Sequence, residues 1–195
     1  MTTLEFYNQN AESFFKDTIQ VDMCELYRPF IQRLKPKGRI LDAGCGSGRD
    51  AKAFLEMGFQ VDAMDASVEM VKLASEYTGL PVKLQMFESI NEVEAYDGIW
   101  TCASLLHLPE AELPNVFTQL TNSLKPGGFW YMSFKYGNGQ REKDGRVFTD
   151  MDEQKMQALL KGCPKLKLFQ QWVTEDIRPL RSERWLNVIA HKCAS

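Results

Sequence analysis

Long apolar runs are absent from this sequence of 195 residues. A membrane-spanning helix needs about 20 predominantly apolar residues, and the longest apolar runs here are only a few residues long. The first residues, MTTLEFYNQNAESFFKD, contain neither the basic flank nor the hydrophobic stretch of a signal peptide. The sequence therefore predicts a soluble, cytoplasmic protein with no membrane partner.

Paired cysteines are also absent. The 5 cysteines are widely scattered and include no CxxC pair, so neither a disulfide framework nor a zinc site is indicated. Hydrophobic residues make up 44% of the chain, which is enough to form a core at this length without such supports. We expect a single domain over residues 1–195, which excludes a disordered chain and a two-domain enzyme.

A strong basic excess is lacking as well, because the net charge is −3. This charge is unevenly distributed along the chain. Residues 1–124 contain 10 Lys and Arg against 18 Asp and Glu, whereas residues 125–195 contain 13 against 8. Either the basic last third is a solvated surface, or it forms one side of a cleft that attracts an anionic ligand.

Apolar periodicity predicts alternating strands and helices after two N-terminal helices at 3–17 and 20–34. Strands are expected at 39–43, 59–64, 82–86, 98–103 and 129–134, with helices at 50–57, 68–77 and 110–124. Such alternation implies an α/β fold, in which helices cover both faces of a parallel sheet as a three-layer sandwich.

The end of the chain follows a different pattern. Residues 137–146 are expected to form a polar loop, followed by a helix at 150–160 and strands at 166–174 and 184–190. Only a short connection joins the last two strands, so we expect them to form an antiparallel C-terminal hairpin. The sequence thus predicts a seven-stranded, mostly parallel sheet.

The most informative segment is RILDAGCGSGRD at 39–50, where a strand runs into a glycine turn. Gly44, Gly46 and Gly48 let a ligand approach the backbone closely, because glycine has no Cβ. Their GxGxG spacing differs from the GxGxxG of dinucleotide sites, and Asp42 precedes them. Asp65 ends the next strand, where a carboxylate either accepts hydrogen bonds from ribose hydroxyls or caps the following helix.

The pattern DxGxGxG resembles motif I of the class I S-adenosylmethionine-dependent methyltransferases. Residues 96–109 are similar to the family's motif IV, and LKPGG at 124–128 is similar to its turn before strand five. The likeness covers 39–134 and is nearest to the small-molecule types, such as the tellurite-resistance and methyltransferase domain 11 or 25 groups. It implies a Rossmann-like fold with a helical lid (1–35), a cofactor-binding core (36–134), and a substrate loop and terminal hairpin (135–195).

The resemblance implies S-adenosylmethionine as the cofactor and an in-line displacement of its methyl group, with no metal. Gly44, Cys45 and Gly46 would hold the methionine moiety through their backbone, with Asp42 at its ammonium and Asp65 at the ribose. Arg49 would bind the cofactor carboxylate or pair with Asp50. The remaining positions implied to contact the cofactor are Tyr7, Ala66, Met70, Phe87, Glu88 and Ala103.

His107 follows the fourth strand, close to where the transferable methyl group would project. An imidazole can accept a proton near neutral pH, so His107 is the candidate catalytic base, although the family often has a histidine here that is not a base. Arginine suits paired recognition of carboxylate or phosphate, which predicts a small anionic acceptor. The candidate substrate-binding residues are Lys135, Tyr136, Arg146, Arg178 and Arg181, with Arg141 and Arg184 nearby.

Other functions remain open at this point. The short chain also resembles tellurite and thiol methyltransferases, whose acceptors are soft nucleophiles. A non-catalytic module that senses S-adenosylmethionine or scaffolds a complex would need the same cofactor residues. A nucleic-acid partner is not expected, because neither NPPY nor DPPY stands at Ala103–Leu106 and the chain has no strong basic excess. The sequence does not predict the acceptor atom or the oligomeric state.

Overall fold

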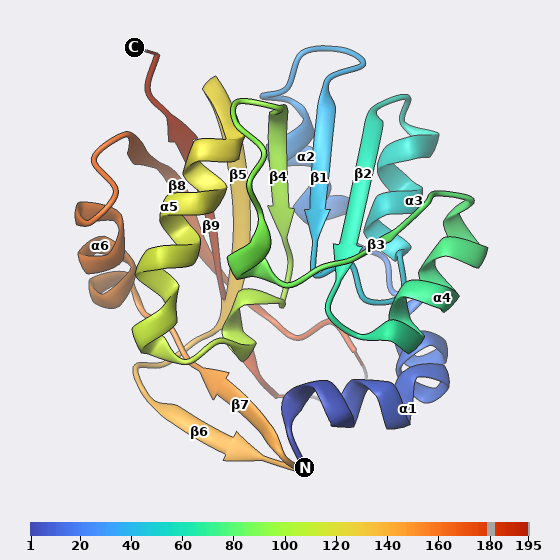
Figure 1. Ribbon diagram of the computed structural model, residues 1–195. Coiled ribbons are helices and arrows are strands. Elements are labelled where there is room, and N and C mark those ends of the chain that lie inside the picture. Colours follow the sequence, from blue (N-terminus) through green and yellow to red (C-terminus); the bar gives the residue numbers. More distant parts are fainter. Residues whose placement is uncertain (179–181, 195) are drawn as a thin grey trace.

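A computed structural model describes residues 1–178 and 182–194 and contains one large sheet (Figure 1). Its strand order is β3-β2-β1-β4-β5-β9-β8. The strands are β1 (Arg39–Ala43), β2 (Gln60–Asp65), β3 (Lys83–Leu84), β4 (Tyr96–Thr101), β5 (Leu124–Lys135), β8 (Leu166–Glu175) and β9 (Arg184–Lys192). Strands β1 to β5 pair in parallel, whereas β9 is antiparallel to both β5 and β8. The expected seven-stranded α/β sheet and its antiparallel terminal hairpin are confirmed.

Helices cover both faces of this sheet. They are α1 (Thr3–Thr18), α2 (Cys24–Ile31), α3 (Arg49–Glu56), α4 (Val68–Thr78), α5 (Leu113–Ser123) and α6 (Glu153–Lys161). Short 3-10 turns occupy Phe87–Ser89, Leu105–His107 and Glu110–Glu112. No helix within residues 1–178 and 182–194 is long and apolar enough to cross a membrane.

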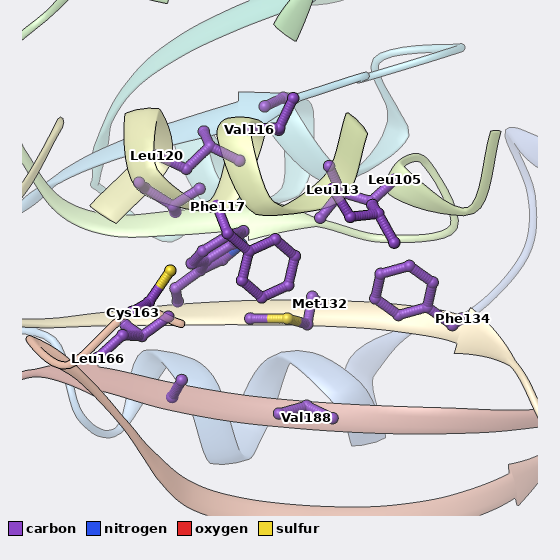
Figure 2. Close-up of a cluster of buried hydrophobic side chains, with 14 of the residues drawn as sticks. Leu105, Leu113, Val116, Phe117, Leu120, Met132, Phe134, Cys163, Leu166 and Val188 are labelled. Atoms are coloured by element: carbon purple, nitrogen blue, oxygen red, sulfur yellow. The ribbon is translucent and has the colours of Figure 1, made fainter. Parts of the chain in front are cut away.

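Side chains of the central strands point alternately to the two faces of the sheet and form a separate hydrophobic core on each face. On one face, α5 packs onto the sheet, and Phe117 and Leu120 meet Met132 and Val188 (Figure 2). On the other face, Tyr27 and Phe30 of α2 and Phe54 of α3 surround Trp100. Buried strands with apolar residues pointing to both faces are typical of a parallel sheet between helical layers.

Local sequence signals explain where several helices begin and end. Thr2 and Glu5 form a capping box at the start of α1. The Ser67 hydroxyl accepts a hydrogen bond from the Met70 amide at the start of α4, and Gly79 ends that helix in the left-handed conformation. Asp152 caps α6 in the same way as Ser67 caps α4. These caps fix the helices that border the carboxyl ends of the strands.

The expectation of a polar loop at 137–146 is wrong, because the structure has a β-hairpin there. Its strands are β6 (Gln140–Lys143) and β7 (Arg146–Thr149). Asp144 and Gly145 form the two-residue turn with φ of 53° and 75°, the combination that Asp-Gly favours in hairpins. Figure 1 shows this hairpin and α1 below the carboxyl ends of the parallel strands, at the same end of the molecule.

Two expected elements also differ in length. The helix expected at 20–34 is only α2, Cys24–Ile31. The strand expected at 82–86 is reduced to the two residues of β3 at the sheet edge, where few pairings stabilise it. Neither of these differences between expectation and structure concerns the ends of β1 and β2.

Candidate active site

The glycine loop after β1 is held close to β2 and to the chain after β4. The amides of Gly44 and Cys45 donate to the Met64 carbonyl at 2.8 and 2.9 Å. Gly44 has a φ of +77°, and a Cβ at this position would lie 2.5 Å from the Ser104 Cβ. The close approach and the left-handed backbone together require glycine here.

Asp65 faces this loop from the end of β2. Its two carboxylate oxygens accept hydrogen bonds from the amides of Gly46 and Ser67, each at 2.9 Å. Burial raises the pKa of the Asp65 carboxyl, and these amides oppose the rise. A carboxylate has about four lone-pair sites, so Asp65 keeps the capacity to accept hydrogen bonds from a ligand.

Arg49 pairs with Asp50, which is one of its two expected roles. Its Nε lies 2.6 Å from Asp50 Oδ1. The same carboxylate accepts hydrogen bonds from the Tyr27 hydroxyl and, at 2.8 Å, from the Trp100 indole. Burial alone would raise the Asp50 pKa, but Arg49 and these donors lower it overall. Asp50 is therefore a buried, ionised carboxylate that borders the cavity next to Arg49.

Asp42 lies next to this group and has a different environment. Its side chain is only 2% exposed, and no described residue satisfies its Oδ2. Burial, together with the negative charge of Asp50, raises the Asp42 pKa well above its usual range. Asp42 is not among the residues that line the cavity, so it faces the loop from behind.

One cavity of about 1360 Å³ collects most of the predicted site. The glycine loop, Asp65 and the region after β4 form one end of it. The first residues of α1, β7 and the ends of β8 and β9 form the other end, and the later residues of α1 reach the glycine loop. The predicted residues that line this cavity are Tyr7, Gly44, Cys45, Gly46, Arg49, Asp65, Ala66, Met70, Phe87, Glu88, Ala103, His107, Lys135, Arg146 and Arg178.

Some predicted substrate residues lie away from the cavity. Tyr136 is not part of its lining, and its hydroxyl donates to Glu153 at 3.0 Å. Arg141 pairs with Asp150 at 3.0 Å, and Arg184 lies over the Tyr136 ring. Arg181 lies outside the described residues. The spacing of Tyr136, Arg141 and Arg184 in the sequence could not show that their side chains pair with Glu153, Asp150 and the Tyr136 ring.

His107 is fixed by hydrogen bonds at both ring nitrogens. Nδ1 lies 2.9 Å from the Val147 carbonyl, which can only accept, so Nδ1 carries the proton. In the neutral ring Nε2 therefore accepts from the Tyr7 hydroxyl, 2.8 Å away. Burial lowers the His107 pKa to about 4, with the charges of Arg146 and Lys135 acting in the same direction. His107 is thus a neutral imidazole that joins α1 to β7.

The cations at this end of the cavity differ in their partners. Lys135 is 8% exposed and pairs with Glu183 at 2.9 Å. Arg178 binds both carboxylate oxygens of Asp176. Arg146 instead has only one carboxylate partner, Asp144 at 3.4 Å, and its guanidinium also interacts with the Tyr7 hydroxyl and lies over the Phe6 ring.

Several lining residues were not predicted from the sequence. Phe6 and Phe148 belong to α1 and β7, and Ser104 donates to the Ala43 carbonyl at 2.9 Å. Ala103 has a φ of +50°, unusual for a residue with a side chain, and its amide donates to Ser133 at 2.8 Å. The Asp144-Gly145 turn was a signal for β7 and hence for Phe148. No comparable signal marks Phe6.

Comparison with known proteins agrees with this geometry. A family model described as a methyltransferase domain matches residues 40–128. A ubiquinone biosynthesis O-methyltransferase of Xanthomonas axonopodis is 34% identical over 110 residues, 52% of this chain and 45% of that protein. The putative methyltransferase YqeM of Bacillus subtilis is 30% identical over 132 residues, 62% and 52% of the two chains. The chain spans about half the length of the curated relatives that it matches.

Solved structures share the whole fold at low sequence identity. The 1,6-didemethyltoxoflavin-N1-methyltransferase of Burkholderia thailandensis, with bound S-adenosylhomocysteine, matches with a TM-score of 0.78 at 21% identity, over 97% of this chain and 84% of that one. The magnesium protoporphyrin IX methyltransferase of Synechocystis has a TM-score of 0.74 at 16% identity, over 97% of each chain.

The protein has a Rossmann-like α/β fold with a cavity at the carboxyl ends of its parallel strands, next to the glycine loop. Ligands bind at this place in such folds. The match of residues 40–128 narrows this class further. Residues 40–128 thus resemble a methyltransferase domain, and the chain has the fold of the solved methyltransferases.

Proposed function

We propose that the chain transfers a methyl group from S-adenosylmethionine to a small-molecule acceptor. One observation carries the proposal: a single cavity of about 1360 Å³ brings Gly44 and Asp65 together with His107 and Arg146. Sites for one small ligand have volumes of roughly 300–1,000 Å³, so this cavity has room for a second molecule beside a cofactor. A sensor or scaffold needs no such space, so the volume favours an enzyme.

The residues at the ends of β1 and β2 fit this cofactor. Gly44 leaves its backbone open to the cavity, and Asp65 has lone pairs for two ribose hydroxyls. In this proposal the loop from Gly44 to Gly46 holds the methionine moiety, and Asp42 supports its ammonium from behind the loop. Ala66, Met70, Phe87, Glu88 and Ala103 line the remaining surface next to Asp65.

The cofactor supplies an activated methyl group when bound, which leaves alignment, exclusion of water and proton removal to the protein. Helix α1 serves the exclusion of water, because it spans both ends of the cavity. A Cβ at Gly46 would lie 3.2 Å from Phe14, and Ser67 binds Asn8 at 2.7 Å. At the other end, Thr3 accepts a hydrogen bond from the Val147 amide at 3.1 Å.

Proton removal from a hydroxyl acceptor runs through Tyr7 to His107 in this proposal. Both nitrogens of His107 are already hydrogen-bonded, so an acceptor reaches Nε2 only by way of the Tyr7 hydroxyl. The acceptor passes its proton to Tyr7 Oη as Tyr7 passes its own proton to Nε2. A pKa of about 4 makes His107 a weak base, yet a hydroxyl that is gaining a methyl group is acidic enough to protonate it.

The acceptor in this proposal is small and anionic. Three cations, Lys135, Arg146 and Arg178, line the cavity. Two of them are neutralised by Glu183 and Asp176, so the support comes mainly from Arg146.

Methyl-labelled S-adenosylmethionine tests the proposal directly. The protein is incubated with the labelled cofactor and a panel of small hydroxyl, amine and thiol acceptors, with and without an anionic group. We expect labelled product and S-adenosylhomocysteine with at least one anionic acceptor. Binding of S-adenosylhomocysteine with no transfer to any acceptor would contradict the enzyme and favour a sensor. Transfer confined to thiols or tellurite would favour the soft-nucleophile alternative.

A further inference from the structure

Arg146 differs from the other cations at the acceptor end of the cavity. Its Nε is buried, and no hydrogen-bond acceptor satisfies it within residues 1–178 and 182–194. Its carboxylate partner Asp144 is 58% exposed, lies 3.4 Å away and belongs to the two-residue turn that precedes Arg146. Arg146 lines the cavity, and a guanidinium whose only carboxylate partner is distant and exposed points to a ligand that supplies a closer anion.

Aromatic rings orient the Arg146 guanidinium. Its centre lies 3.9 Å from the centroid of Phe6 and 5.2 Å from that of Phe148. Guanidinium groups stack with their flat faces on rings, which leaves the N–H donors in their plane available for hydrogen bonds. A carboxylate matches two parallel N–H donors, so this geometry suits a planar carboxylate.

The same aromatic residues continue along the cavity. Phe148 lies 5.0 Å from the His107 ring, and His107 lies 5.4 Å from Tyr7. Tyr7 is in turn 5.6 Å from Phe6, so the four rings form a connected set around Arg146. Walls of this kind favour flat aromatic ligands, because rings gain stacking and edge-to-face contacts beyond simple burial.

We infer that the acceptor is an aromatic monocarboxylate, whose carboxylate binds Arg146 and whose ring packs among Phe6, Tyr7 and Phe148. This inference rests on the proposed function and names the substrate class of the same site. A single carboxylate is favoured over a dianion because Lys135 and Arg178 already pair with Glu183 and Asp176. Arg146 is therefore the specificity-determining residue, and it lies at the start of β7.

Calorimetry with the protein saturated by S-adenosylhomocysteine tests the inference. The probes are ring-hydroxylated benzoates, the corresponding benzamides, and the saturated hydroxycyclohexanecarboxylates. We expect at least one benzoate to bind about 10-fold or more tighter than both its amide and its saturated counterpart. Arg146→Gln should weaken that benzoate about 10- to 100-fold, the range expected for a charge-assisted hydrogen bond, and leave the benzamide unchanged.

Arg178→Gln is the matched control, because Arg178 lines the same cavity but is already paired with Asp176. It should change benzoate affinity by less than about threefold. Equal weakening by both variants, or no preference for benzoates in the unmodified protein, would overturn the inference. Weaker binding of S-adenosylhomocysteine by Arg146→Gln would also overturn it, since Arg146 would then serve the cofactor. Failure of the unmodified protein to bind S-adenosylhomocysteine would instead overturn the proposed function on which it rests.

Discussion

The two ends of the cavity are built from different parts of the chain and with different chemistry. The end formed by β1, β2 and β4 uses backbone amides, glycines and buried carboxylates from residues 42–65, supported by Ser104. The other end uses aromatic and cationic side chains from α1, β7 and the ends of β8 and β9. The first end is formed by elements that follow one another in the sequence. The second end forms only when folding brings together segments about 140 residues apart, as the contact of Thr3 with Val147 shows.

This difference suggests that the two ends can vary independently. Backbone groups at strand ends bind a constant ligand whatever the neighbouring side chains are. Side chains on an inserted hairpin can change without disturbing the sheet, which is where substrate selection is expected in such folds. Variants that affect one end and leave the other unchanged therefore test the comparison.

The largest effect is expected from Gly44→Ala at the first end. The added Cβ would lie 2.5 Å from the Ser104 Cβ in a residue with a φ of +77°. We expect the affinity for S-adenosylhomocysteine, measured by calorimetry, to fall on the order of 100-fold, equivalent to about 3 kcal/mol. Gly79→Ala is the control, because Gly79 has the same φ with nothing within 4 Å of an added Cβ. Equal affinities of the two variants would show that binding does not depend on the close packing of Gly44 against Ser104.

A second effect of similar size is expected in the pH dependence of stability. Burial lowers the His107 pKa from 6.5 to about 4, so between these values the unfolded chain binds a proton that the folded chain does not. Stability should therefore be constant above about pH 6.5 with respect to this group and fall by about 3 kcal/mol as the pH drops to 4. Urea unfolding at several pH values measures how the free energy of unfolding changes with pH. His107→Gln should make this change smaller between pH 4 and 6.5. An unchanged pH dependence in the variant would contradict a buried neutral imidazole at His107.

Asp65→Asn tests the same end of the cavity as Gly44→Ala and is expected to reduce the affinity by a smaller factor. Loss of the carboxylate charge should weaken S-adenosylhomocysteine binding about 10- to 100-fold, because hydrogen bonds to charged groups contribute about 1.5–3 kcal/mol. The raised pKa of Asp65 further implies that affinity falls as the pH falls through that pKa. Asp62→Asn is the matched control on the same strand, since Asp62 pairs with Arg39 away from the cavity. Similar losses in both variants would remove Asp65 from the site.

Tyr7→Phe should give the smallest effect on stability. It removes one hydrogen bond to His107 and keeps the ring, so the free energy of unfolding should fall by about 1 kcal/mol. Turnover with a hydroxyl acceptor should fall, while S-adenosylhomocysteine affinity should change less than in Asp65→Asn. Unchanged turnover would remove the relay through Tyr7 from the mechanism.

The proximity of the glycine loop and Asp65 could be predicted because these residues follow neighbouring strands at fixed spacings. Gly44 and Asp65 lie at the ends of neighbouring parallel strands, and strand ends of this kind meet wherever the alternating pattern is present. The same reasoning could not show that Asp42 lies behind the loop, since its burial depends on Asp50 and Trp100, which come from other elements.

The acceptor end could be predicted only as a charge pattern. The basic last third does contribute Lys135, Arg146 and Arg178 to the cavity. Which of them is free to bind a ligand depends on tertiary pairing, as in Lys135 with Glu183 at 48 residues' separation. The β6–β7 hairpin was missed because each strand has only 4 residues and β6 is entirely polar, although the Asp144-Gly145 turn favoured a hairpin.

Calorimetric titration of S-adenosylhomocysteine into the unmodified protein, Gly44→Ala and Arg146→Gln tests the separation of the two ends most directly. The account predicts one binding site in the unmodified protein, the same affinity within about twofold in Arg146→Gln, and a loss on the order of 100-fold in Gly44→Ala. No binding to the unmodified protein, or equal losses in both variants, would contradict it.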